Sequence, residues 1–130
     1  MKKILIIAAN YYPKITNDLI AKSKKALKSK YKIETIKVPG VFEVPYIISK
    51  YINKYDAFIA LGCVIKGETP HFDFISTSVN NGLMNLSIMN KKPIGNGILT
   101  CLNKKQALKR ISKGFDAALA VDHILNNVPK

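Results

Sequence analysis

Residues 67–71, Gly-Glu-Thr-Pro-His, combine groups that bind phosphate with a group that can move protons. Apolar residues at helical spacing follow this segment, so it is expected to begin a helix, and free backbone N–H groups at a helix start suit an anion. Thr69 adds a hydroxyl donor, and the imidazole of His71 is the side chain best suited to transfer protons near neutral pH. The same residues also fit a plain helix start, with Thr69 as N-cap and Pro70 in the first turn. Both interpretations remain open from this pattern alone.

Arg110 is a second candidate because it is the one arginine among 21 basic residues. Where lysine is used almost everywhere, a single arginine suggests a task that lysine performs poorly, such as bidentate contact with phosphate. An ordinary ion pair is the alternative. Glu43 follows Pro39-Gly40, so it fits either the first turn of a helix or an acceptor for ligand hydroxyls. His123 falls in an apolar helical segment and is expected to have a structural role.

Alternating apolar runs and amphipathic segments predict the elements that position these residues. Apolar runs predict buried strands at residues 3–9 and 57–62, and further strands are expected at residues 33–38 and 94–99. Helices are expected near residues 16–29, 43–52, 72–86, 103–113 and 115–126, the first of them capped by Thr16. This alternation predicts one α/β domain over residues 1–130, with a four-stranded parallel sheet and helices on both faces.

Parallel sheets of this kind bind ligands at the carboxyl ends of their strands. The segments that follow or close the predicted strands are also the richest in Gly, Pro and polar residues. We therefore expect four of them to converge on one pocket: residues 10–14, 39–43, 63–71 and 95–97.

A net charge of +13 would ordinarily suggest a nucleic-acid partner. The lysines, however, are spread from Lys2 to Lys130, and Lys22, Lys25 and Lys28 share one side of a predicted helix, opposite its apolar positions. This pattern favours a solvated basic face. No nucleic-acid partner is expected.

Apolar runs in this sequence are short. None approaches the ~20 residues of a membrane-spanning helix, and the run from Ile4 to Ala9 is too short for the core of a signal peptide. We therefore expect a cytoplasmic protein that has no membrane partner. Cys63 and Cys101 show no paired metal-ligand spacing, so neither a metal nor, in that compartment, a disulfide is expected.

Two long motifs resemble the signature stretches of the lumazine synthase family. Residues 38–45, Val-Pro-Gly-Val-Phe-Glu-Val-Pro, resemble its VPGAFEIP pattern. Residues 60–73, Ala-Leu-Gly-Cys-Val-Ile-Lys-Gly-Glu-Thr-Pro-His-Phe-Asp, resemble its LGxVIRGxTxHF pattern. Residues 93–100, 106–110 and 113–116 resemble later parts of the family in the same order, so the resemblance covers nearly the whole chain.

The resemblance implies a flavodoxin-like three-layer fold and an enzyme that needs no metal or organic cofactor. Its two small-molecule substrates would be 5-amino-6-(D-ribitylamino)uracil and 3,4-dihydroxy-2-butanone 4-phosphate. Their condensation to 6,7-dimethyl-8-ribityllumazine, with release of phosphate and water, would be the penultimate step of riboflavin biosynthesis. The family also implies a homo-oligomer, which we expect to be a pentamer, with each active site shared between adjacent subunits.

Roles for individual residues follow from the same resemblance. His71 would move protons. The pyrimidine and ribityl contacts would come from Tyr11, stacking where the family usually has Phe or Trp, and from Val41, Phe42, Glu43, Cys63, Val64, Ile65 and Asn96. The phosphate would be held by Glu68, through its backbone N–H, by Thr69, and by Arg110 and Lys113 of the neighbouring chain.

Three departures from the family pattern shape these expectations. Asn96 stands where many members carry a Phe over the substrate ring, so the neighbour's contribution is expected to be polar. The chain begins almost directly with its first strand, and the link between Arg110 and Lys113 is short. Both features favour a pentamer over an icosahedral shell.

Two rival functions remain open: a basic module that binds nucleic acid, and a relative that holds a flavin or pyrimidine without catalysis. Mixing the two substrates and following lumazine absorbance and phosphate release separates both rivals from the enzyme.

Overall fold

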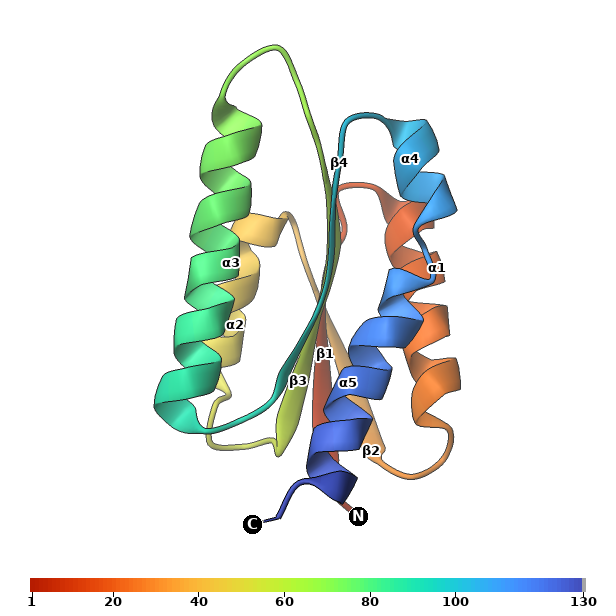
Figure 1. The fold of residues 1–130 in the computed structure, drawn as a ribbon, viewed down its shortest axis with the longest axis vertical. Helices are drawn as coiled ribbons and strands as arrows, with labels where there is room; N and C mark the ends of the chain where they lie inside the picture. The colour runs from red at the N-terminus through yellow and green to blue at the C-terminus, as the bar shows by residue number, and fades with distance from the viewer. Residues whose placement is uncertain (130) are drawn as a thin grey trace.

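Strands and helices alternate along the chain in a computed structural model, which describes residues 1–129 (Figure 1). The strands are β1 Lys3–Ala9, β2 Lys32–Val38, β3 Ala57–Ile65 and β4 Ile94–Cys101. The helices are α1 Pro13–Leu27, the 3-10 turn η1 Val41–Glu43, α2 Val44–Lys50, α3 His71–Asn90, α4 Lys104–Lys109 and α5 Lys113–Asn127. All strand pairs are parallel, in the order β2-β1-β3-β4. The predicted α/β class and four-stranded parallel sheet are confirmed.

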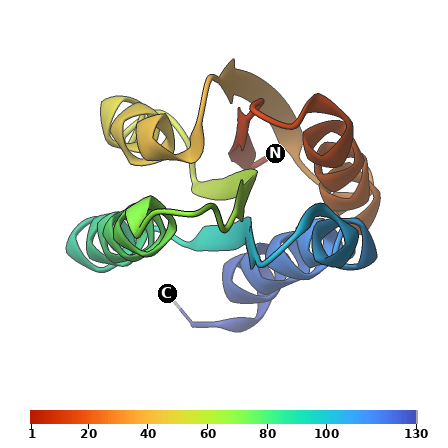
Figure 2. The same ribbon diagram turned by 90° about the horizontal axis from the view of Figure 1, so that it is seen from above.

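The sheet is the middle of three layers. Seen edge-on, it has α2 and α3 on one face and α1, α4 and α5 on the other, and the view from above shows the same division (Figures 1 and 2). This arrangement is consistent with the expected flavodoxin-like fold.

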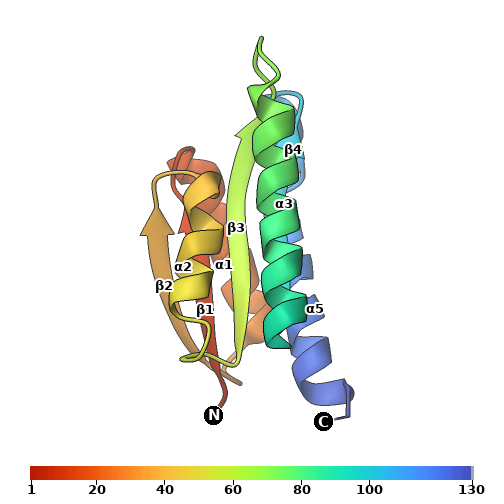
Figure 3. The same cartoon turned by 90° about the vertical axis from the view of Figure 1, so that its left-hand side faces the viewer.

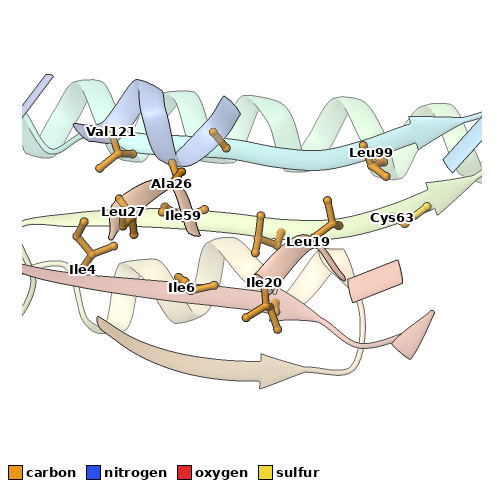
Figure 4. Close-up of a cluster of buried hydrophobic side chains, with 14 of the residues drawn as sticks. Ile4, Ile6, Leu19, Ile20, Ala26, Leu27, Ile59, Cys63, Leu99 and Val121 are labelled. Carbon is orange, nitrogen blue, oxygen red and sulfur yellow. The ribbon is translucent and has the colours of Figure 1, made fainter. Parts of the chain in front are cut away.

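Alternate residues of β1 enter two separate cores, because successive side chains of a strand point to opposite faces. Ile4 and Ile6 pack with residues of α1 and α5, such as Leu19 and Val121 (Figure 4). Leu5 and the other alternate residues of the strand pack on the α2 and α3 side. Burial on both faces explains the continuous apolar run that predicted this strand.

The predicted cap of the first helix is wrong. Helix α1 begins at Pro13, whose fixed φ suits the first helical turn. Thr16 lies inside the helix and is fully buried, where its Oγ1 donates to the Ala9 carbonyl at 2.5 Å. The hydroxyl therefore ties α1 to the end of β1 instead of capping the helix.

Helices α1 and α5 pack closely through small residues. A Cβ atom on Gly114 would lie 2.5 Å from the Leu19 carbonyl oxygen, so a larger residue would push the two helices apart. Ser23 Oγ donates to the Gly114 carbonyl at 2.7 Å across the same contact. This contact sets the position of the start of α5 and of the turn that precedes it.

A polar cluster joins the start of β2 to α5. The hydroxyl of the buried Tyr31 donates to Asp122 Oδ1 at 2.5 Å, and Asn126 Nδ2 donates to the Tyr31 oxygen at 2.6 Å. The Tyr31 hydrogen bond lowers the pKa of Asp122; partial burial opposes it, and Lys30, 3.4 Å away, adds to it. The cluster therefore stabilises the fold most when Asp122 is ionised.

Tyr31→Phe should lower the free energy of unfolding by about 1–2 kcal/mol at neutral pH, because Asp122 loses a hydrogen-bond donor. The pKa of Asp122 is lower in the folded than in the unfolded chain, so its contribution is present above about pH 4 and is lost as the pH falls further. The variant should therefore lose less stability on acidification. Urea unfolding across this pH range measures both effects. Tyr46→Phe, at an exposed tyrosine, is the control; equal behaviour of the two variants would contradict the role of Tyr31.

Candidate active site

A cavity of about 300 Å³ lies where β1 and β3 end. The carboxyl ends of β1, β2 and β3 point the same way, and the loop after β3 rises beyond them (Figure 3). Three of the four segments expected at this edge meet here, together with the first turn of α3. The lining residues are Tyr11, Tyr12, Gly40, Val41, Phe42, Cys63, Val64, Ile65, His71 and Ile75.

The fourth segment does not reach this cavity. Residues 95–97 pair with residues 59–61 in the first half of β4, which continues to Cys101. Gly95 lies under α5, and a Cβ atom there would be 2.5 Å from the Ala117 carbonyl oxygen. The glycines of this segment allow α5 to pack closely on β4. This packing explains why the segment has a glycine-rich composition like that of a ligand-binding loop.

Asn96, Arg110 and Lys113 come together at a second hollow of about 460 Å³, between β4 and the α4–α5 turn. Lys109 also lines it, so three cationic side chains face one carboxylate, that of Asp116. Within residues 1–129 the Arg110 guanidinium makes no ion pair, so the alternative of a structural ion pair finds no support there. The expected site residues therefore divide between two separate hollows of one chain.

The start of α3 differs slightly from the expected cap. Pro70 is the N-cap residue and His71 is the first helical residue. Thr69 Oγ1 accepts a long hydrogen bond, 3.4 Å, from the His71 N–H. Glu68 and Thr69 are exposed in the loop between Ile65 and His71, and these last two residues line the cavity. Local capping is thus weak, and the remaining helix-start donors stay open to an anion.

Glu43 holds the turn that forms one wall of the cavity. Its Oε1 accepts from the Gly40 N–H at 3.0 Å, and its own N–H donates to the Gly40 carbonyl at 3.3 Å. Val41 in this turn packs against the sheet, where a Cβ on Gly62 would approach its Cγ1 to 2.8 Å. The second oxygen of Glu43 makes no hydrogen bond within the described residues, so a structural role and a ligand contact remain compatible.

Cys63 forms part of the apolar wall of this cavity, and its thiol is not suited to act as a nucleophile. Burial, with a smaller contribution from Cys101, raises the pKa of the Cys63 thiol to about 11. Both cysteines are free and buried. At neutral pH the Cys63 side chain is therefore a neutral thiol of low reactivity.

Sequence reasoning assigned no individual role to three lining residues, Tyr12, Gly40 and Ile75, although the first two lie in segments expected at the pocket. The Tyr12 ring meets that of Tyr11 edge-on, with centroids 4.9 Å apart, and burial raises its pKa. Its place beside Tyr11 in a converging segment was the available signal. His123, for which a structural role was expected, is exposed on α5, where its Nδ1 lies 3.4 Å from Nδ2 of Asn127.

Residues 1–129 contain no cluster of three His, Cys, Asp or Glu side chains that could hold a metal ion. No helix in the same range is long and apolar enough to cross a membrane.

Comparison with known proteins identifies a family and several relatives. Residues 1–128 match the family model described as 6,7-dimethyl-8-ribityllumazine synthase. A protein of that name from Corynebacterium kroppenstedtii is 34% identical, with 93% of this chain and 81% of the relative aligned. A second protein of that name, from Campylobacter jejuni subsp. doylei, is 38% identical, with 95% of this chain and 88% of the relative aligned. A third, from Saccharopolyspora erythraea, is 37% identical, with 88% of this chain and 75% of the relative aligned.

Alkylation tests the state of Cys63. In a Cys101→Ala chain, Cys63 should react slowly with iodoacetamide near neutral pH and faster as the pH approaches 11, because only the thiolate reacts. Mass spectrometry follows the modification, and the same chain in denaturant is the control and should react quickly. Native and denatured chains that react equally fast would contradict a buried, neutral thiol.

Proposed function

Because the chain belongs to the 6,7-dimethyl-8-ribityllumazine synthase family, we propose that the cavity beside His71 binds its pyrimidine substrate. The chain is a transferase of riboflavin biosynthesis. It condenses 5-amino-6-(D-ribitylamino)uracil with 3,4-dihydroxy-2-butanone 4-phosphate and releases phosphate and water. Mixing the two substrates and following lumazine absorbance and phosphate release tests this activity directly.

Apolar surface and a few polar groups make the cavity suitable for a substituted ring. Its volume of about 300 Å³ is at the small end of the usual range for ligand sites. Tyr11 is 72% exposed at its mouth, so its ring is free to stack on the pyrimidine. Val41, Phe42 and residues 63–65 would supply apolar and backbone contacts, and the second oxygen of Glu43 would accept from ribityl hydroxyls.

The phosphate of the second substrate would lie at the start of α3. Backbone N–H groups near Glu68 and the Thr69 hydroxyl would donate to it. Arg110 and Lys113 would complete the site from a neighbouring subunit. The observation that carries this proposal is the division of the site residues between two hollows, because one chain then holds both halves of a shared site.

The reaction follows from holding the two substrates in register. The amine of the pyrimidine attacks the ketone, and loss of water leaves an imine. Phosphate is then eliminated, the ring closes, and a second water is lost. Positioning supplies much of the acceleration, and proton transfer by His71 would add about 10²–10⁴-fold.

We also propose a homopentamer, whose interfaces would bring the two halves of each site together. Large apolar side chains exposed on α3, Phe74, Met84 and Ile88, supply surface for such a contact. Residues 1–130 would act as one domain. A cytoplasmic location would suit the two free thiols.

His71→Ala should reduce kcat by about 10²-fold or more, because no other group replaces its proton transfer. The free energy of unfolding should change little, since the side chain is exposed. Steady-state kinetics and urea unfolding measure the two quantities. His123→Ala, at the exposed histidine of α5, is the matched control. Normal turnover in His71→Ala would remove the residue from the mechanism.

Arg110→Lys should raise KM for the keto-phosphate about tenfold, because lysine keeps the charge but loses the bidentate contact. KM for the pyrimidine serves as the internal control and should stay constant. An unchanged KM for the keto-phosphate would reject the phosphate role.

Mixed oligomers show whether Arg110 acts across the subunit boundary. Subunits carrying His71→Ala and subunits carrying Arg110→Ala, assembled together, should be more active than either variant alone, since some sites then combine both native groups. Activity no higher than that of the separate variants would place both residues in one subunit's site.

A further inference from the structure

Lysines that are far apart in the sequence gather where the strands of the sheet begin. Because the strands are parallel, the N-terminus and the turns that lead into β2, β3 and β4 lie at one end of the molecule (Figures 1 and 3). We call this end the amino edge; it comprises residues 1–3, 28–32, 50–56 and 91–92. Each of these segments contains at least two lysines, and none contains an arginine. The amino edge is therefore a basic surface made of lysine alone.

Little negative charge offsets these lysines. Asp56 is the only acidic residue in the four segments, and its Oδ2 accepts from the backbone N–H of Lys3 at 2.7 Å. Lys30 pairs with Asp122 of α5 at 3.4 Å, and this is the one ion pair within residues 1–129. The other lysines of the amino edge have no carboxylate partner in that range, and most of them are exposed. Their charge is therefore open to an anionic partner.

Helix ends account for only part of this charge. Helices α1, α2, α3 and α5 end at or near the amino edge (Figure 1). Lysines close to a helix C-terminus offset the partial negative charge there, which amounts to about half an elementary charge for each helix. This effect falls off within the last turn of the helix. The lysines of the amino edge outnumber the helices that end there, so a surplus of positive charge remains.

The composition of the amino edge favours a duplex nucleic acid over other anionic partners. Protein interfaces are enriched in arginine and exposed aromatic residues and depleted in lysine. Here Tyr31 is buried, Tyr51 and Tyr55 are half-buried, and the Nζ of Lys3 lies 5.0 Å from the Tyr55 ring centroid. None of these three rings is therefore presented for stacking on an unpaired base, the contact on which single-strand binding relies.

The width of the amino edge suits the backbone of a duplex. Four strands about 4.8 Å apart place the outer strands about 14 Å from each other. That length of a DNA duplex carries about eight phosphate charges. The turns of the amino edge are short, so they would contact phosphates and leave the base edges in the grooves unread. Phosphate contacts by themselves carry no sequence information.

We propose that the amino edge binds the phosphate backbone of double-helical DNA without sequence preference. None of the residues assigned to catalysis or substrate binding lies in this edge, so the DNA contact and the reaction are independent. The proposal departs from the expectation drawn from the sequence, where lysines spread along the chain indicated a solvated face and no nucleic-acid partner. Parallel strands bring together at one end what the sequence spreads out.

Fluorescence anisotropy of a labelled DNA duplex, titrated with the whole protein at about 50–200 mM KCl, measures this contact. The logarithm of the association constant should fall linearly with the logarithm of the salt concentration, because each neutralised phosphate releases counterions. An edge variant combines Lys28→Gln, Lys32→Gln, Lys54→Gln and Lys91→Gln. It should bind at least tenfold more weakly at low salt, with a slope smaller by about 3–4. If this variant does not fold, the first two and the last two substitutions, made separately, should each produce about half of the change in slope.

A matched variant removes the same charge elsewhere. Lys22→Gln, Lys37→Gln, Lys104→Gln and Lys105→Gln change exposed lysines outside the amino edge. This variant should change DNA affinity by less than about twofold, because charges far from the contact are screened by salt. Both variants should form lumazine at the rate of the unmodified protein and keep its melting temperature, since neither set of lysines contacts the substrates in the proposed function.

Other outcomes would overturn the proposal. No binding of the unmodified protein to the duplex at about 50 mM KCl would exclude the DNA contact. Equal loss of affinity in the two variants would assign binding to net charge and not to the amino edge. Tighter binding to single-stranded DNA, duplex RNA, poly-glutamate or phosphatidylglycerol vesicles than to duplex DNA would identify a different class of anionic partner.

Discussion

Parallel pairing of β1 with β2 and β3 is the constraint on which the rest of the structure depends. Parallel neighbouring strands need a crossover connection. Each strand of this sheet therefore ends at the same edge and is followed by a helix. The three turns that line the cavity beside His71 are brought together in this way. Hydrogen bonds such as that from Asn10 N to the Val38 carbonyl, 2.8 Å, extend the pairing into the first of these turns.

Small residues let neighbouring elements of this sheet-and-helix arrangement pack closely, and this packing fixes the shape of the two hollows. Gly62 lets Val41 pack onto the sheet, and Gly95 lets α5 pack onto β4. Gly114 does the same between α5 and α1. Added methyl groups at such positions would displace backbone or well-packed side chains, and overpacking of this kind costs about 1–3 kcal/mol. The walls of both hollows therefore depend on residues that contribute no chemistry themselves.

Local patterns predicted the elements well, most clearly for β1 and β3, because burial on both faces gives each of these strands a continuous apolar run. They failed where one residue type serves two purposes. Thr16 is a good N-cap residue, yet Pro13 starts the helix earlier and leaves the hydroxyl to bond with Ala9. Residues 95–97 have the composition of a ligand loop, yet their glycines accommodate α5. Only long-range packing distinguishes these cases, and the same holds for the meeting of Asn96 with Arg110.

Charge explains why the proposed site needs a second subunit. The start of α3 offers backbone donors to a phosphate, but the exposed carboxylates of Glu68 and Asp73 flank it and would weaken its attraction for an anion. The hollow lined by Lys109, Arg110 and Lys113 instead carries an excess of positive charge, which attracts an anion. Juxtaposing two copies would set this cationic surface against the anion-binding turn. In the proposed assembly, a phosphate would then bind strongly only where two subunits meet, and the keto-phosphate would be recognised only after the site is complete.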